Sequence, residues 1–316
     1  MKKKYNFENI FADALKCNHC GLCLQNCPAY RRYKEEISSP RARVQIANLL
    51  IKKKITVKQD RQALLKCVQS CQNCFNCAVL CPAGINPCDI NQKLKNLLSI
   101  KGKKSPKPLL KNMLLKLKFR KYFGKKDILF LTSSSDFKQI AKTLNLLKQN
   151  NFDVSLYKEI CHFASAFFAG KTFKIPLNYN VYIFDDIENY RLVKNKISKG
   201  ELNIKPEQIL YITQTVKPNT IKLPEESLII KSNVFLTQET KEEEEKLFNI
   251  FKNKTLNFVN ERYYYGPVFH EKTVEYFKQV PQKTLITLSE RENKFLEIIF
   301  KKHKIDKEVI SIQNFI

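Results

Sequence analysis

The sequence predicts an α+β protein in which an N-terminal α-helical domain is followed by an α/β domain with a largely parallel sheet. Its 316 residues are enough for about two domains. Ten of the eleven cysteines lie between Cys17 and Cys88, where apolar residues follow a helical spacing. Farther along the chain, short apolar runs alternate with amphipathic stretches, which is typical of a parallel sheet covered by helices. We place the parts at residues 1–100, 101–126 and 127–316.

The composition is that of a globular protein inside the cell. Hydrophobic residues make up 43% of the chain, and no apolar run reaches the roughly 20 residues needed to span a bilayer. The N-terminus, MKKKYNFENIFADALK, lacks the apolar core of a secretory signal. An odd number of cysteines argues against a disulfide framework. We therefore expect a cytoplasmic protein, with attachment to the inner face of the membrane as the alternative.

Positive charge is concentrated in the part of the chain that holds the cysteines. The net charge is +26. Residues 1–120 hold 25 Lys and Arg against 6 Asp and Glu, whereas residues 121–316 hold 31 against 24. A basic surface can bind nucleic acid, anionic lipid or an acidic protein, or it can simply keep the protein soluble. Charge alone leaves these alternatives open.

The cysteines form two copies of one motif, Cys-x-x-Cys-x-x-Cys-x-x-x-Cys-Pro. The first copy runs from Cys17 to Pro28, and the second begins 54 residues later, from Cys71 to Pro82. Three thiolates at this interval can hold one [4Fe-4S] cluster, and in two-cluster ferredoxins the fourth binds the other cluster. The motif therefore predicts two [4Fe-4S] clusters with crossed ligands: Cys17, Cys20, Cys23 and Cys81 at the first, and Cys71, Cys74, Cys77 and Cys27 at the second.

Structural zinc is the main alternative for such closely spaced thiols. Zinc sites use two Cys-x-x-Cys pairs, which explain neither the third cysteine of each motif nor the Cys-Pro that follows. Thiol redox chemistry is a weaker alternative still. Cys67 and Cys88 could each replace a ligand, although we expect buried apolar thiols at both positions. We expect His19, inside the first motif, to be an exposed loop residue.

Helical stretches lie between and after the motifs. In SPRARVQIANLLIKKK, apolar residues from Val44 to Ile51 form one stripe, Ser38 or Ser39 can cap the helix, and Pro40 suits its first turn. A second helix is expected near Ile90–Ser99. Helices at these places favour an α-helical ferredoxin domain, because a β-hairpin ferredoxin would space its motifs more closely.

The basic linker contains a stretch, Leu109–Phe123, in which leucines alternate with lysines. It predicts an amphipathic helix that could lie on anionic lipid. We favour the alternative that its leucines pack on the ferredoxin domain while its lysines face water.

The second half alternates strands and helices. The predicted strands are DILFLT, FDVSLY, NVYIFD, QILYIT, LIIKSNVFL, KTLITLS and EVISI. The predicted helices are SDFKQIAKTLNLLKQNN, behind a serine cap, then TQETKEEEEKLFNIF and ERENKFLEIIFKKHK. This order favours a largely parallel sheet.

The stretch CNHCGLCLQNCPAYRRYKEEISSPRARVQIANLL resembles the N-terminus of the iron–sulfur subunits of glycolate oxidase. Related subunits occur in anaerobic glycerol-3-phosphate dehydrogenase, lactate-utilisation proteins and heterodisulfide reductases. The second motif, ending CPAGI, is similar as well. The resemblance implies a dicluster domain followed by an α/β domain with two cysteine-rich repeats, written CCG. It also implies that electrons pass between a flavoprotein dehydrogenase and an acceptor.

The α/β half departs from that family's pattern because it lacks the cysteines. Cys161 stands where the first cysteine of a pair is expected, His162 at the second, and Phe163 replaces a glycine. No cysteine follows Cys161. IFDDIEN and ITLSEREN stand where Cys-x-x-Cys turns would fall. There they offer Asp186, Asn189, Ser289 and Glu292. We expect a CCG-like domain without a third cluster, and we assign no role to Cys161, His162, His270 or His303.

These observations predict a non-catalytic electron-transfer subunit. Two adjacent clusters form a short wire, and nearby cations ease their reduction. Arg31, Arg32, Arg41 and Arg43 are the candidate cations. The resemblance implies an FAD-binding 2-hydroxy-acid dehydrogenase, such as glycolate oxidase, as electron donor, together with a further acceptor. The chain has only seven glycines and no glycine-rich dinucleotide motif, so a flavin or nicotinamide site of its own is not expected.

Two other functions remain as alternatives. The chain could be a heterodisulfide reductase-like enzyme subunit, although the missing cysteines count against this. It could also be a nucleic-acid-binding protein with structural clusters. No nucleic-acid-binding motif is present, so nucleic acid is not the expected partner. The membrane surface stays open as a partner.

Overall fold

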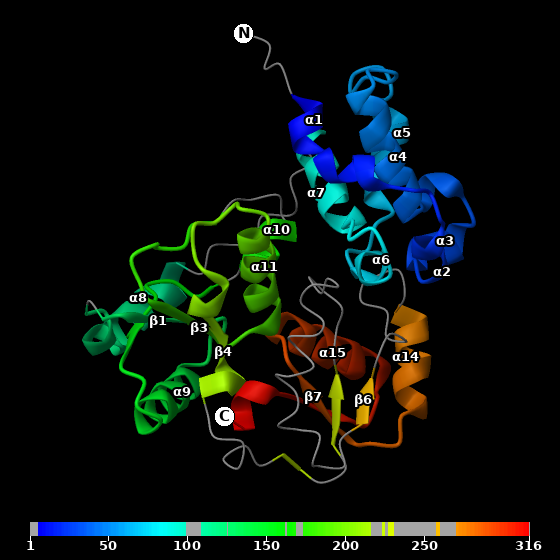
Figure 1. Cartoon of the computed structure of the whole chain (residues 1–316). Coiled ribbons are helices and arrows are strands. Elements are labelled where there is room, and N and C mark those ends of the chain that lie inside the picture. Colours follow the sequence, from blue (N-terminus) through cyan, green and yellow to red (C-terminus); the bar gives the residue numbers. More distant parts are fainter. Residues whose placement is uncertain are drawn as a thin grey trace.

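The structure is a computed structural model of the chain. It describes residues 6–98, 109–124, 126–161, 163–168, 173–215, 223–224, 227–230, 257–259 and 270–315. Figure 1 shows a helical N-terminal part beside an α/β part, as the sequence predicts. The domain boundaries themselves stay predictions. Among the described residues, no helix is both long and apolar enough to cross a lipid bilayer.

Short helices build the N-terminal part. They are α1 (Phe7–Ile10), α2 (Leu22–Gln25), α3 (Pro28–Tyr33), α4 (Pro40–Ile51), α5 (Arg61–Gln69), α6 (Asn76–Val79) and α7 (Pro87–Leu97). Single turns of 3-10 helix cover Ala12–Lys16 and Glu36–Ser38. Helices α4, α5 and α7 pack together around a core that includes Leu50, Leu64, Val68, Ile90 and Leu94.

Helix α4 forms where the sequence predicts it, for the predicted reasons. The Ser39 hydroxyl oxygen accepts a hydrogen bond of 2.9 Å from the Ala42 N–H, and Pro40 occupies the first turn. Val44, Ala47 and Leu50 are buried. The helix places Arg41 and Arg43 on the side where the cysteine motifs meet.

Within the described residues, the strands of the second half form two sheets of four parallel strands. The first sheet has the order β2 (Val154–Leu156), β1 (Ile128–Leu131), β3 (Val181–Phe184), β4 (Ile209–Tyr211). The second has the order β6 (Asn257–Val259), β5 (Leu228–Ile230), β7 (Thr284–Thr287), β8 (Glu308–Ser311). The predicted parallel pairing is confirmed. The two sheets repeat one topology, which the strand pattern alone did not reveal.

The helices of this half are α9 (Phe137–Gln149), α10 (Phe163–Phe168), α11 (Ile187–Ser198), α14 (His270–Gln279) and α15 (Glu290–His303). Short 3-10 turns cover Pro206–Gln208, Ile212–Thr215 and Ile312–Phe315. The predicted helix over 237–251 and the end of the predicted strand over 228–236 lie outside the described residues, as does His162.

The predicted serine cap of α9 is wrong. Asp136 is the cap, because its carboxylate accepts a hydrogen bond of 2.9 Å from the Lys138 N–H. The Ser134 hydroxyl instead accepts from the Asp136 N–H and donates to the Gln139 side-chain oxygen, at 3.1 and 2.9 Å. Serine therefore shapes the turn before the helix without capping it.

The turns IFDDIEN and ITLSEREN follow corresponding strands, β3 and β7, and they meet. Asp186 caps α11 and Ser289 caps α15 through side-chain oxygens that accept from Asn189 and Glu292 backbone N–H groups. The Asp186 carboxylate also accepts from the Glu290 N–H at 3.0 Å. The residues at these positions therefore have a structural role as caps that join the two sheets.

The preferred prediction for the linker helix is wrong. In α8 (Leu109–Lys118), Leu115 is fully buried in the core that also holds Leu129 and Phe130 of β1. The other described apolar side chains of the helix, Leu110, Met113, Leu114 and Leu117, are exposed. Apolar residues stand on two opposite faces of the helix, so burying one face leaves the other in solvent.

Candidate metal centre

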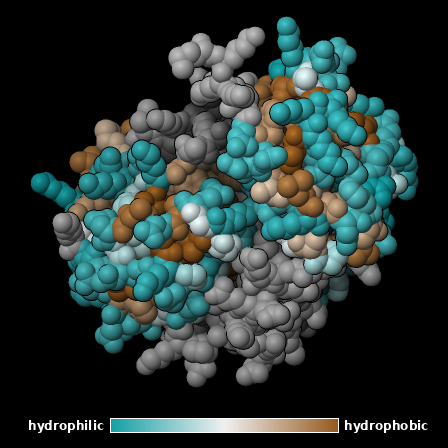
Figure 2. All heavy atoms as spheres, turned by 45° about the horizontal axis from the view of Figure 1, so that its top comes forward, coloured by the Kyte–Doolittle hydropathy of each residue, from teal (hydrophilic) through white to brown (hydrophobic). Residues whose placement is uncertain are grey.

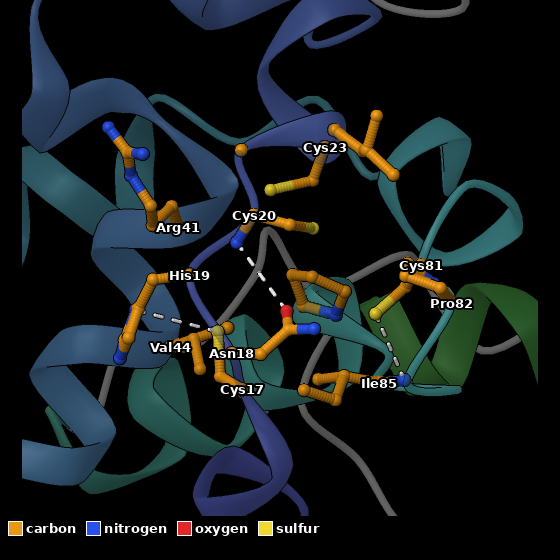
Figure 3. Close-up of a pocket in the computed structure, with 13 residues that line it drawn as sticks. Cys17, Asn18, His19, Cys20, Cys23, Arg41, Val44, Cys81, Pro82 and Ile85 are labelled. Carbon is orange, nitrogen blue, oxygen red and sulfur yellow. Dashed lines mark hydrogen bonds between the residues drawn. The ribbon is translucent and has the colours of Figure 1, made fainter.

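Thiols of both motifs line a first cavity. The cavity measures about 400 Å³ and is open to solvent on one side. Its wall carries Cys17, Cys20 and Cys23 of the first motif and Cys81 of the second. Figure 3 shows the loop of Cys17 to Cys23 facing the segment of Cys81 across this space.

A second cavity, of about 270 Å³, has the complementary set of thiols. It is lined by Cys71, Cys74 and Cys77 of the second motif and by Cys27 of the first. A fifth thiol, that of Cys88, also lines it. Each predicted ligand set thus gathers at one cavity, although the iron ligands themselves stay a prediction.

The donor chemistry fits a thiolate-bound cluster. Four thiols line the first cavity and five line the second, and no carboxylate belongs to either wall among the described residues. Within the described part of the chain, no three His, Cys, Asp or Glu side chains group as ligands of a single metal ion.

The two motif loops share an unusual backbone conformation. The residues two and four positions after the first cysteine have positive φ in both copies: His19 (60°) and Gly21 (81°), then Asn73 (54°) and Phe75 (63°). Glycine adopts this region freely, whereas a bulky residue does so at a cost of about 1–3 kcal/mol. Burial of the Phe75 ring, which is fully inaccessible, offsets that cost. The sequence repeat is therefore also a repeat of loop geometry.

A helix begins after the last cysteine of each motif: α3 directly after Cys27, and α7 at Pro87, a few residues after Cys81. Cys27 precedes α3, whose first residue is Pro28. The Cys81 sulfur accepts a hydrogen bond of 3.4 Å from the Ile85 N–H. Such a bond to a ligand sulfur is one of the means by which a protein sets the potential of a cluster.

At least one thiol of each cavity has a pKa that its surroundings raise. Burial, and then the neighbouring Cys77, Cys17 and Cys81, raise the pKa of Cys23 to about 12. Burial, and then Cys77, raise the pKa of Cys74 well above its usual range. Crowded thiolates repel one another, so a bound cation is required to hold them in the ionised form.

Arginines of α4 supply positive charge at both cavities. Arg41 lines the first cavity and pairs with Glu36 at 2.8 Å, while Arg43 lines the second. Burial would lower the pKa of Arg43, but the nearby thiols of Cys71 and Cys67 outweigh it, and the net shift is upward. Of the four predicted arginines, Arg31 and Arg32 on α3 line neither cavity.

Three further residues that the sequence analysis considered are His19, Cys67 and Cys161. His19 is exposed, as predicted, yet it lines the first cavity, with its ring Nδ1 3.7 Å from the Cys17 sulfur and 2.9 Å from the Gln45 amide nitrogen. Cys67 is fully buried in the N-terminal core. Cys161 is buried in the α/β core, where burial raises the pKa of its thiol well above the usual range. Cys161 belongs to the lining of neither thiol-lined cavity.

Cys88 is the residue whose place sequence reasoning did not predict. Its side chain is buried, as expected, but it faces the second cavity, with its sulfur 3.8 Å from that of Cys77. The sequence signal for its position is the stretch NPC at 86–88. Asn86 caps α7 and Pro87 is its first residue, so Cys88 lies in the first turn of the helix. A hydrogen bond with Cys88 is the main cause that lowers the pKa of Cys71.

Two thiol-lined cavities within the helical N-terminal part are typical of an iron–sulfur protein. Residues 13–85 match the family model of the 4Fe-4S dicluster domain. Over 85 residues the chain is 28% identical to the glycolate oxidase iron-sulfur subunit of Escherichia coli (strain K12). The match covers 26% of this chain and 20% of that subunit, so it spans about a fifth of the relative's length. No solved structure matches the chain.

These comparisons confirm the resemblance to iron–sulfur subunits of the glycolate oxidase superfamily. The family match falls on the cysteine-rich half. The chain therefore carries a dicluster domain and binds iron–sulfur clusters.

Proposed function

We propose that this chain is the electron-transfer subunit of an oxidoreductase complex, with two [4Fe-4S] clusters and no catalytic site of its own. The observation that carries the proposal is the division of the eight motif cysteines between two cavities, four at each. A bound [4Fe-4S] cluster exchanges single electrons. The thiols hold the clusters, and Arg41 and Arg43 supply positive charge that favours the reduced state.

The close approach of the two cavities supports a relay. Helix α2, which carries Cys23, packs against α6, which carries Cys77. Among the neighbouring thiols that raise the pKa of Cys23, Cys77 has the largest effect, although the two residues line different cavities. In this proposal an electron enters at the cluster of the exposed first cavity and is then transferred to the cluster of the second cavity.

The electron donor that we propose is an FAD-dependent 2-hydroxy-acid dehydrogenase of the glycolate oxidase type. The support is the relative, which is an iron–sulfur subunit of glycolate oxidase. A disulfide reductase function is not favoured, because Cys161 is only 1% exposed and lies among apolar side chains. No observation in the described residues favours nucleic acid as a partner.

Anaerobic capture of the tagged chain from its own cells tests this proposal. We expect FAD to co-purify, and we expect one of glycolate, D-lactate or L-lactate to reduce the clusters, as seen by electron paramagnetic resonance. A chain that purifies with its clusters but without flavin, and that none of these substrates reduces, contradicts the proposed donor. Addition of dithionite is the control that shows whether the clusters can be reduced at all.

A further inference from the structure

Helix α8 presents an apolar stripe to solvent. Leu110, Met113, Leu114 and Leu117 are 65%, 53%, 41% and 69% exposed. Their spacing, i, i+3, i+4 and i+7, places all four on one face of the helix. Large apolar side chains that gather in this way mark a surface that another body covers.

The opposite face of α8 fixes the direction in which the stripe points. Leu115 is fully buried, and Phe119, just after the helix, is nearly so. The Asn112 side chain, also on this face, accepts a hydrogen bond of 3.1 Å from the Ile160 N–H. The helix is therefore anchored to the α/β half, and its stripe faces outward. Figure 1 shows α8 at the edge of that half, and Figure 2 shows exposed apolar side chains among hydrophilic ones on the described surface.

Positive charge surrounds the stripe on both sides. At 100° per residue, Lys111 and Lys118 lie along one edge of the stripe and Lys116 lies along the other. The segment 101–126 holds ten lysines, one arginine and no acidic residue. Apolar residues flanked by lysines on both sides match a surface that is anionic outside and apolar just beneath.

We propose that α8 binds the surface of an anionic lipid bilayer and lies parallel to it. The lysines contact lipid phosphates, and the stripe enters the boundary between the headgroups and the acyl chains. An acidic protein would neutralise the lysines equally well, but it would need an apolar groove along the middle of its acidic surface. A bilayer offers both features everywhere on its surface.

Sedimentation with vesicles tests this proposal on the full-length, cluster-loaded protein. We expect binding to vesicles of equal parts phosphatidylglycerol and phosphatidylcholine, and little binding to phosphatidylcholine alone. The double variant Leu114→Gln, Leu117→Gln should lose about tenfold in affinity, because two leucines no longer leave water. Salt at about 1 M, where the Debye length is about 3 Å, should weaken binding of the unchanged protein.

Ile298→Gln provides a matched control. Ile298 is 67% exposed on α15, so the change removes an equally exposed apolar residue away from the stripe. It should leave vesicle binding unchanged. Equal binding to both kinds of vesicle, equal loss in the control, or unchanged binding of the double variant would overturn the proposal. So would a dimer in solution that the double variant abolishes, because a second copy would then cover the stripe.

A separate observation concerns the second cavity, which has one thiol more than a cluster needs. Cys88 is 2% exposed, its sulfur lies 3.8 Å from that of Cys77, and it lines the second cavity together with Cys71. Its backbone is fixed by Asn86, whose side-chain oxygen accepts from the Cys88 N–H at 3.1 Å. The thiol is therefore held against Cys77, a predicted ligand of the second cluster.

We infer that Cys88 is a positioning residue whose S–H donates a hydrogen bond to a ligand sulfur and raises the potential of the second cluster. A donated hydrogen bond withdraws electron density from the sulfur and favours the reduced cluster. This inference rests on the proposed function, since it presupposes a cluster at this cavity.

Redox titration of Cys88→Ala followed by electron paramagnetic resonance tests the inference. We expect full iron content and a lower midpoint potential for one cluster, with the other unchanged. Cys88→Ser, which keeps a donor, should restore most of the shift. Loss of iron in Cys88→Ala would make Cys88 a ligand, and an unchanged potential would remove its role; both outcomes overturn the inference. Failure of the unchanged protein to bind iron would instead overturn the proposed function.

Discussion

Replacing Cys20 or Cys81 by alanine will remove the same cluster, although the two residues are 61 positions apart. Both line the first cavity, which has no fifth thiol among the described residues, so a lost ligand has no substitute there. Each variant should keep about half of the iron and the spectrum of the second cluster. Iron analysis and electron paramagnetic resonance of the anaerobically purified variants will measure this.

Cys67→Ala is the matched control for these variants. Cys67 is fully buried in the N-terminal core and lines neither cavity, although it lies near Arg43 of the second cavity wall. Its removal should cost some stability but no iron. Different residual spectra for the Cys20 and Cys81 variants would contradict the assignment of both residues to one cluster.

Replacing Arg43 by methionine will destabilise the N-terminal part and lower the potential of the second cluster. The Arg43 guanidinium is 1% exposed, and its Nη2 donates to the Ser70 hydroxyl at 2.8 Å and to the Ser38 carbonyl at 3.2 Å. Methionine leaves these acceptors without their donor and leaves the neighbouring thiolate charge without its buried cation. The expected loss is about 3 kcal/mol of unfolding free energy. Anaerobic guanidinium unfolding, followed by cluster absorbance, measures it.

Arg41→Met is the comparison for this prediction. Arg41 stands two residues away on the same helix, but its pair with Glu36 is partly exposed to solvent. Such a pair contributes about 0–1 kcal/mol, so the unfolding midpoint should shift little. Equal stability of the Arg41 and Arg43 variants would contradict the claim that the buried Arg43 guanidinium stabilises the N-terminal part.

Local signals were sufficient to predict much of the N-terminal part. Helix α4 was predictable because its cap, its proline and its apolar stripe agree. The pairing of distant thiols was predictable because the motif repeats. The NPC sequence places Cys88 in the first turn of α7, but that the thiol faces the second cavity depends on how α7 packs.

The α/β half shows why patterns fail where burial is complete. Helix α11 has buried residues on all sides, including Glu188, Arg191 and Lys194, so its sequence carries no apolar stripe. In α8 apolar residues stand on two opposite faces, and only the tertiary structure decides that the face of Leu115 is the buried one. The second sheet was not separated from the first, because the strand pattern does not say which strands pair.

The iron content of two variants tests the crossed pair of [4Fe-4S] clusters most directly. Each variant carries two ligand substitutions in a Cys88→Ala background, so that no spare thiol can replace a lost ligand. Cys20→Ala with Cys81→Ala removes two ligands of one predicted cluster, and about four iron atoms per chain should remain. Cys20→Ala with Cys27→Ala removes one ligand from each, and almost no iron should remain. The reverse result, with iron retained only in the second double variant, would show that each motif holds its own cluster. Zinc in place of iron in the unchanged protein would contradict the clusters altogether.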